Sequence, residues 1–156
     1  MSTTTRGREL LTKEQRNHFM RFPEDEYFIG SYYTFSKHDL KVIKKHRKEE
    51  NQLGFALQLA SLRYPGWPYI LNKNIPEIIV KYIAKQVDTV PRSLKYYSLR
   101  EGTYREHIKE IRDVYGYISF SQKEYALVSK YLTDLALEND DSIFLIDKCI
   151  WFLREN

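Results

Sequence analysis

Apolar residues recur every three or four positions along most of this 156-residue chain. That spacing places them on one face of an α-helix, whereas a half-buried strand would show sustained alternation with a period of two. No such alternation is found along the sequence. The pattern therefore predicts an all-α protein, a multi-helix bundle without a sheet.

Capping residues and prolines set the expected limits of these helices. A Ser, Thr, Asp or Asn before the first turn, followed three residues later by an acid or an amide, forms a capping box. Proline suits a first turn but cannot continue a helix. The expected helices begin at Thr12 (ending before Phe22), near Pro23, at Ser36 (ending at about Lys48), at about Asn51 (ending near Tyr64), at Asn74, at about Thr103 (ending at Tyr115), at Ser121 and near Asp141, with a short turn after Pro91.

The helix expected from about Asn51 to Tyr64 carries apolar residues on two faces. Leu53, Leu57 and Ala60 share one face, and Phe55 and Leu59 lie on another. A helix that is apolar all round is usually buried. We therefore expect this helix to lie at the centre of the bundle.

The expected domain organisation is simple. Residues 1–10 are polar and should form a tail, and residues 11–156 should form one helical domain. The loop between Gly66 and Asn74 leaves open two lobes, about 11–66 and 74–156, that share a core. Ile150 to Leu153 lie deep in an amphipathic helix close to the last residue, so we expect the chain to be part of a longer protein.

Basic residues cluster along two of the expected helices. The chain has 25 Lys and Arg against 21 Asp and Glu, a net charge of +4. This small excess is compatible with a nucleic-acid partner but does not require one. Whether the chain binds nucleic acid depends on where the charges cluster. Residues three, four and seven positions apart share a helical face. The resulting candidates for DNA contact are Lys37, Lys41, Lys44, Lys45, Arg47 and Lys48 on the first helix, and Arg100, Arg105, Lys109 and Arg112 on or just before the second.

Each stripe also has an ordinary interpretation, the solvated face of an amphipathic helix. The second stripe lies beside Glu106, Glu110 and Asp113, but Asp39 is the only acid from Ser36 to Lys48. The first stripe is therefore the stronger candidate. Its lysines would position phosphates, because each cation near a phosphate releases a condensed counterion. The arginines would recognise bases, because an arginine can donate two hydrogen bonds to one guanine.

Catalytic and metal-binding patterns are missing from the sequence. The four histidines and the single cysteine show no paired zinc spacing, and the scattered glycines form no phosphate loop. Cys149 has apolar neighbours and is expected to be a core thiol. His107 is expected on the buried side of its helix, and Arg63 to be held at the end of the central helix. No signal peptide or membrane span is readable, so we expect a soluble, cytoplasmic protein with no membrane partner.

The segment Leu53–Gly66 (LGFALQLASLRYPG) resembles the N-terminal signature of Tn-three-type transposases, the enzymes of replicative class II transposons. The similarity covers about Arg6 to Asn156. One departure is visible, since the family commonly has Arg after the Thr103 position, where this chain has Tyr104. The other matching segments are Tyr33–Ser36, Asp39–Leu40, Arg47 with Asn51, Ile83–Gln86, Tyr97 with Arg100, Thr103 with Glu106–His107, and Ile150–Arg154.

This resemblance implies a DNA-binding module with helix-turn-helix-like elements, which recognises the terminal inverted repeat of a transposon in a bacterial cytoplasm. It implies partners in double-stranded DNA and in the remaining transposase domains, with self-association in the full-length protein. The family's metal-dependent Asp-Asp-Glu site would lie outside this chain, so we expect no enzyme activity and no cofactor in this fragment. A helical protein-interaction domain for transposase assembly or regulation is the alternative.

Overall fold

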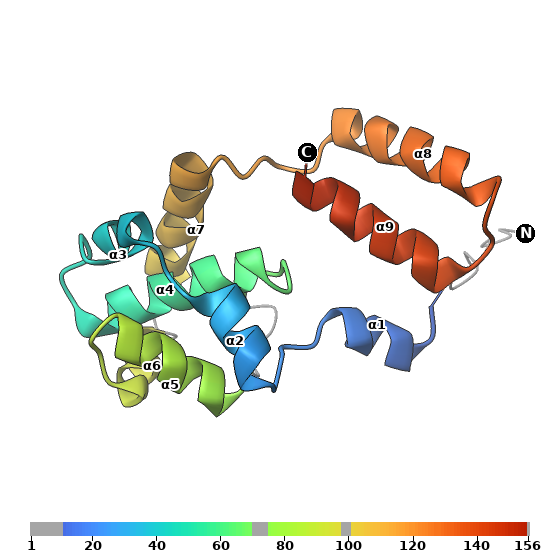
Figure 1. The fold of residues 1–156 in the computed structure, drawn as a ribbon. Helices are drawn as coiled ribbons and strands as arrows, with labels where there is room; N and C mark the ends of the chain where they lie inside the picture. Colours follow the sequence, from blue (N-terminus) through green and yellow to red (C-terminus); the bar gives the residue numbers. More distant parts are fainter. Residues whose placement is uncertain (1–10, 70–74, 98–100, 156) are drawn as a thin grey trace, which may run out of the picture. The chain divides into compact units, whose positions relative to one another are not determined.

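The computed structural model describes residues 11–69, 75–97 and 101–155, and within these ranges the chain is helical without a strand (Figure 1). The all-α prediction is confirmed. The helices are α1 (Lys13–Phe19), α2 (Glu26–Tyr33), α3 (Lys37–Ile43), α4 (Glu49–Arg63), α5 (Glu77–Gln86), the 3-10 turn η2 (Pro91–Ser93), α6 (Leu94–Tyr97), α7 (Glu101–Tyr115), α8 (Gln122–Ala136) and α9 (Ser142–Glu155).

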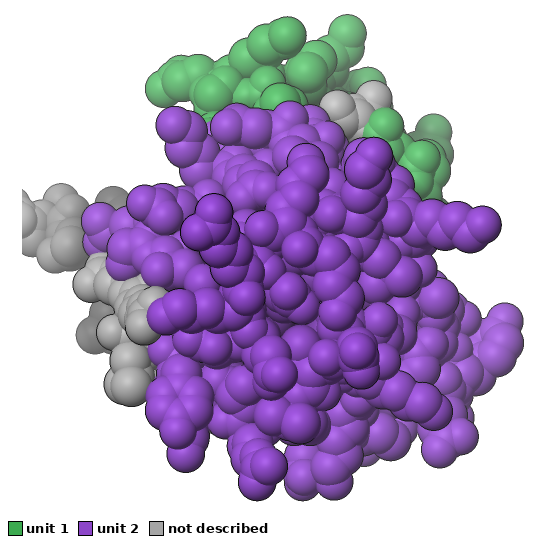
Figure 2. Space-filling model, turned by 90° about the vertical axis from the view of Figure 1, so that its left-hand side faces the viewer, with its two compact units in different colours: residues 1–19, 118–156 green, residues 20–117 purple. Residues whose placement is uncertain are grey.

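The chain divides into two compact units (Figure 2). Unit 1 comprises residues 1–19 and 118–156, and unit 2 comprises residues 20–117. Helices from both sides of the loop after Gly66 pack together inside unit 2, because α4 contacts α3 before it and α5, α6 and α7 after it. Unit 2 therefore includes helices from both sides of this loop. The expected tail, residues 1–10, lies outside the described residues.

Helix α4 forms the centre of unit 2, as its sequence predicted. Every residue from Leu53 to Ser61 is buried. At Gly54 the ring of Tyr97 on α6 packs so closely that a Cβ would lie 2.3 Å from it. Glycine is required here because only a residue without a side chain lets the two helices approach to this distance.

The expected capping boxes at Thr12, Ser36 and Ser121 are all present. Two other starts differ from the prediction. Residue Asp25 caps α2 with its side chain, so Pro23 precedes that helix instead of opening it. Helix α5 begins after Pro76, and the expected cap Asn74 lies outside the described residues.

The expected end of the third helix at Lys48 is wrong, because α3 ends at Ile43. The amides of Lys45 and His46 bond back three residues, to the carbonyl oxygens of Val42 and Ile43, and tighten the chain into a turn. This turn directs the His46 ring against Phe55 on α4, with ring centroids 4.5 Å apart. Burial of these side chains outweighs the local preference of residues 44–48 for helix.

Unit 1 has few buried side chains. Its helices α8 and α9 pack on each other, and the rings of Tyr131 and Phe152 stack with their centroids 4.5 Å apart. In these two helices, however, Val128 of α8 is the only buried residue. Cys149 is half-buried, and burial raises the pKa of its thiol. Across the described part of the chain, no helix has the length and hydrophobicity needed to span a bilayer.

Candidate nucleic-acid interface

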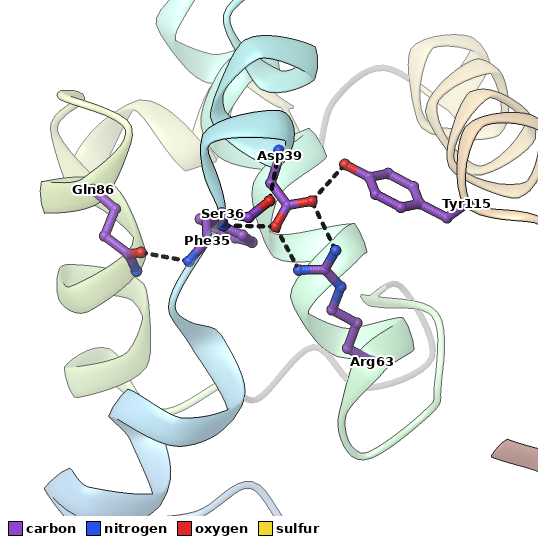
Figure 3. Close-up of polar contacts among 6 residues, drawn as sticks. All are labelled: Phe35, Ser36, Asp39, Arg63, Gln86 and Tyr115. Atoms are coloured by element: carbon purple, nitrogen blue, oxygen red, sulfur yellow. Dashed lines mark hydrogen bonds and ion pairs between the residues drawn. The ribbon is translucent and has the colours of Figure 1, made fainter. Parts of the chain in front are cut away.

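A buried ion pair joins the start of α3 to the end of α4 (Figure 3). The Asp39 side chain is only 4% exposed. Both guanidinium nitrogens of Arg63 donate to its carboxylate, at 2.9 and 2.8 Å. The backbone amide of Ser36 donates at 2.8 Å and the hydroxyl of Tyr115, from α7, at 2.9 Å. The carboxylate therefore holds three helices together.

These contacts decide the charge states of the pair. Burial alone would raise the pKa of Asp39, but the hydrogen bonds from Arg63, Ser36 and Tyr115 together hold it well below its usual range. Burial would lower the pKa of Arg63, and its hydrogen bond to Asp39 raises it instead. Both groups are thus ionised at neutral pH, and their charges balance each other. The expectation that Arg63 is held at the end of the central helix is confirmed.

This pairing leaves a surface segment whose exposed charges are all positive. We call residues 37–48 the basic segment. Its single acid, Asp39, is turned inward and neutralised, whereas Lys37, Lys41, Lys45, Arg47 and Lys48 are exposed. A phosphate approaching this segment therefore meets cations without a carboxylate of the same segment between them.

The basic segment is not the single helical stripe that the spacing predicted. Only Lys37 and Lys41 stand on α3, and the other cations follow on the turn. The Nζ atom of Lys44 donates to the carbonyl oxygen of Val87, at the end of α5. Lys44 therefore also holds α3 and α5 together, a task that the sequence did not reveal.

The second predicted stripe lies on α7, where Arg105, Lys109 and Arg112 are exposed. Arg100, the fourth candidate, lies outside the described residues. The opposite face of α7 is buried through His107 and Ile111. The expected acids accompany this stripe, and Glu110 lies 3.5 Å from the Nε2 atom of His46.

A cluster of rings fixes α7 and the turn of the basic segment on α4. The His46 and His107 rings lie 4.4 Å apart between centroids, and the hydroxyl of Tyr97 is 3.0 Å from Nδ1 of His107. Burial lowers the pKa of His107 to about 4, with a smaller contribution from His46. Burial also lowers the pKa of His46, although Glu110 opposes the shift. Both imidazoles are therefore neutral at pH 7, and His107 is a core histidine, as expected.

Helices α3 and α4, which the turn of the basic segment joins, resemble a helix-turn-helix only in their connectivity. A recognition helix must present one face to a DNA groove. Helix α4 is buried on every side from Leu53 to Ser61, so that stretch has no face to offer. The parts of this pair that remain accessible are the exposed side of α3 and the turn that follows it.

Sequence reasoning missed two further cations near this turn. Arg92 on η2 and Lys95 on α6 line a cavity of about 610 Å³ together with Lys48. Elements of three and four residues are too short to show a periodic stripe, so no spacing pointed to them. No group of three or more His, Cys, Asp and Glu side chains that could hold a metal ion occurs among the described residues.

The fold and its surface define a helical module with an exposed cationic segment. Residues 10–156 match the family described as Domain of unknown function (DUF4158), and the chain belongs to this family. It is 56% identical over 151 residues to the transposase of transposon Tn1546 from Enterococcus faecium. It is 34% identical over 148 residues to that of Tn501 from Pseudomonas aeruginosa, and 33% identical over 147 residues to that of Tn21 from Escherichia coli.

These alignments cover 97%, 95% and 94% of the chain but only 15% of each relative's length. The resemblance to Tn-three-type transposases is therefore confirmed for a segment that spans about 15% of such a protein.

Proposed function

We propose that this chain is a DNA-binding module of a transposase and that it binds the terminal inverted repeat of its transposon in the bacterial cytoplasm. The observation that carries the proposal is the basic segment. Its cations are exposed, while its single acid is neutralised inside the fold by Arg63. The relatives are named as transposases of transposons, which supports DNA as the polyanion that this surface would bind.

The lysines and arginines of this surface would have different functions in DNA binding. The lysines are point charges on flexible stems, suited to holding phosphates. Base reading is assigned to Arg47 on the turn, Arg105 and Arg112 on α7, and Arg100. A phosphate contact strengthens binding to any duplex, whereas a base contact strengthens binding only to the correct sequence.

Charge-removal variants test the proposal. The 156-residue chain is titrated against a duplex from the end of Tn1546 and a scrambled duplex of equal length, at two salt concentrations. Alanine at Lys37, Lys41, Lys45 or Lys48 should weaken binding to both duplexes and lower the salt slope by about one. An arginine that reads a base should cost roughly 1–3 kcal/mol on the terminal sequence alone.

Lys81 provides a matched control for these variants. It is an exposed lysine of unit 2 whose charge is already balanced by Glu77, at 2.7 Å. Lys81→Ala should therefore leave both affinities unchanged. Wild-type affinity and salt slope in every variant of the basic segment would show that it is only a solvated surface and would remove the basis of the proposal.

We propose further that this part of the transposase neither cuts nor joins DNA. Two-metal phosphoryl chemistry needs clustered carboxylates, and the resemblance assigns the family's Asp-Asp-Glu site to another part of the protein. A supercoiled plasmid incubated with the chain and Mg²⁺ or Mn²⁺ should remain supercoiled. Nicking that co-purifies with the chain through repeated chromatography would contradict this assignment.

A helical protein-interaction domain remains the second candidate, and the surface of unit 1 favours it. Phe120, Leu127 and Leu153 are between 43% and 58% exposed, and they line a groove of about 320 Å³ at α8 and α9. Exposed apolar patches often mark interaction sites. Sedimentation across a range of protein concentrations tests this candidate. Self-association that is independent of salt and abolished by Leu127→Asp would support it over DNA binding.

A further inference from the structure

The cavity of about 610 Å³ in unit 2 lies where η2 and α6 pack on the first turn of α4. We propose that it is a second phosphate site for the DNA backbone, continuous with the basic segment through Lys48. The inference rests on the proposed function and extends it to Arg92 and Lys95, which belong to neither predicted stripe. Lys48 is the last residue of the basic segment and also lines the cavity. A DNA strand bound at the turn would therefore lie next to the cavity.

The walls of the cavity are held in place by the core. Tyr97 is buried against Gly54 and fixes α6 on α4. The hydroxyl of Ser93 donates to the carbonyl oxygen of Val90, the residue before η2, at 2.8 Å. The neighbouring Tyr96 is 52% exposed, with the Nζ atom of Lys95 4.7 Å from its ring centroid. A site built on fixed elements costs little conformational entropy when it binds.

The charges of the cavity indicate which anion it suits. The lining includes three cations, Lys48, Arg92 and Lys95, and two acids, Glu49 and Glu50, which leaves a small positive excess. That excess is too small to capture a free phosphate from solution. It suffices for a phosphate that the basic segment already holds nearby, because tethering raises the effective concentration. Pockets of about 300–1,000 Å³ accommodate small molecules, so volume does not limit entry of a sugar-phosphate unit.

The experiment compares variants that remove a positive charge from the cavity with one that removes a negative charge. Arg92→Ala and Lys95→Ala should each weaken binding of the Tn1546 end duplex and of the scrambled duplex several-fold, and lower the salt slope by about one. Glu49→Gln removes an exposed acid from the same wall and should strengthen binding to both duplexes. Lys81→Ala should bind as wild type does. Circular dichroism and thermal melting confirm that each variant is folded.

The outcomes separate this inference from the proposed function. If alanine variants of the basic segment weaken binding while Arg92→Ala, Lys95→Ala and Glu49→Gln match wild type, the cavity is not a phosphate site and the proposed function stands. If the loss in Arg92→Ala is confined to the terminal sequence, Arg92 reads a base and the phosphate assignment is overturned. If the wild-type chain binds neither duplex, the proposed function fails and the inference fails with it.

Discussion

Replacing Arg63 with methionine should destabilise unit 2, because it leaves the Asp39 carboxylate buried without its cation. Removing one partner of a buried ion pair typically costs about 3–5 kcal/mol. Water can reach this site, since 29% of the Arg63 side chain is exposed, and the bonds from Ser36 and Tyr115 remain. We therefore take the lower value, ~3 kcal/mol. At roughly 4–8 °C per kcal/mol for a domain of this size, the melting temperature should fall by at least ~12 °C.

The cost should depend on pH in a defined direction. Because the folded-state pKa of Asp39 lies below its unfolded value of about 3.9, the wild-type pair stabilises the fold fully above that pH and loses this contribution as the pH falls further. Without Arg63, burial dominates and raises the pKa of Asp39. Mild acid then protonates the buried carboxyl, which removes the cost of an unpaired charge and makes the variant less unstable. The difference between wild type and Arg63→Met should therefore shrink as the pH is lowered.

Urea unfolding followed by circular dichroism measures this difference at neutral and at mildly acidic pH. Arg92→Met is the matched control, since Arg92 is exposed and its replacement should change stability by less than about 0.5 kcal/mol. An Arg63→Met protein as stable as wild type at neutral pH would refute the reasoning. A cost that persists unchanged in mild acid would show that lost packing, and not the unpaired carboxylate, is responsible.

Three further substitutions test the core. Leu57 is fully buried, so Leu57→Asp should abolish cooperative thermal unfolding, and a wild-type melt would contradict its place in the core. Gly54→Ala should cost about 1–3 kcal/mol in urea, because its Cβ would collide with Tyr97; an unchanged midpoint would count against that close packing. Since the pKa of His107 falls from 6.5 to about 4 on folding, stability should drop by up to ~3 kcal/mol between these pH values as the pH is lowered. His107→Gln should remove most of that drop in pH-dependent urea titrations, and an undiminished drop would assign it to other groups.

Much of the fold followed from local signals in the sequence. Capping boxes depend on residues three positions apart, and the boxes at Ser36 and Ser121 formed as expected. The burial of the central helix was predictable, because the segment from Leu53 to Ala60 has no polar face that would favour exposure to solvent.

The end of α3 could not be predicted, because distant residues determine it. Residues 44–48 are good helix formers by themselves. The packing of His46 against Phe55 and the bond from Lys44 to Val87 depend on α4 and α5, which no periodicity within α3 encodes. The cations Arg92 and Lys95 were missed for a similar reason, since they join the basic segment only through tertiary packing.

Several residues that carry the family resemblance form hydrogen bonds with one another in the structure. Gln86 accepts from the amide of Phe35 and donates to the carbonyl of Tyr33, both at 2.8 Å, and the hydroxyl of Tyr33 donates to the carbonyl of Tyr64 at 3.1 Å. Asp39, from a further matching segment, forms the buried ion pair with Arg63, which precedes Tyr64. The sequence signature therefore describes the packing of unit 2 and says little about which bases are read.

This distinction separates the cations of unit 2 into two groups. Lys44 and Arg63 have bonds to Val87 and Asp39 that hold helices together, so their replacement should destabilise the module and thereby weaken DNA binding indirectly. Lys45 and Lys48 stand exposed on the turn and can be removed without disturbing the core. A loss of affinity in Lys44→Ala therefore supports DNA contact only if its melting temperature is unchanged. The same loss in Lys45→Ala or Lys48→Ala, with the fold intact, reports on the interface itself.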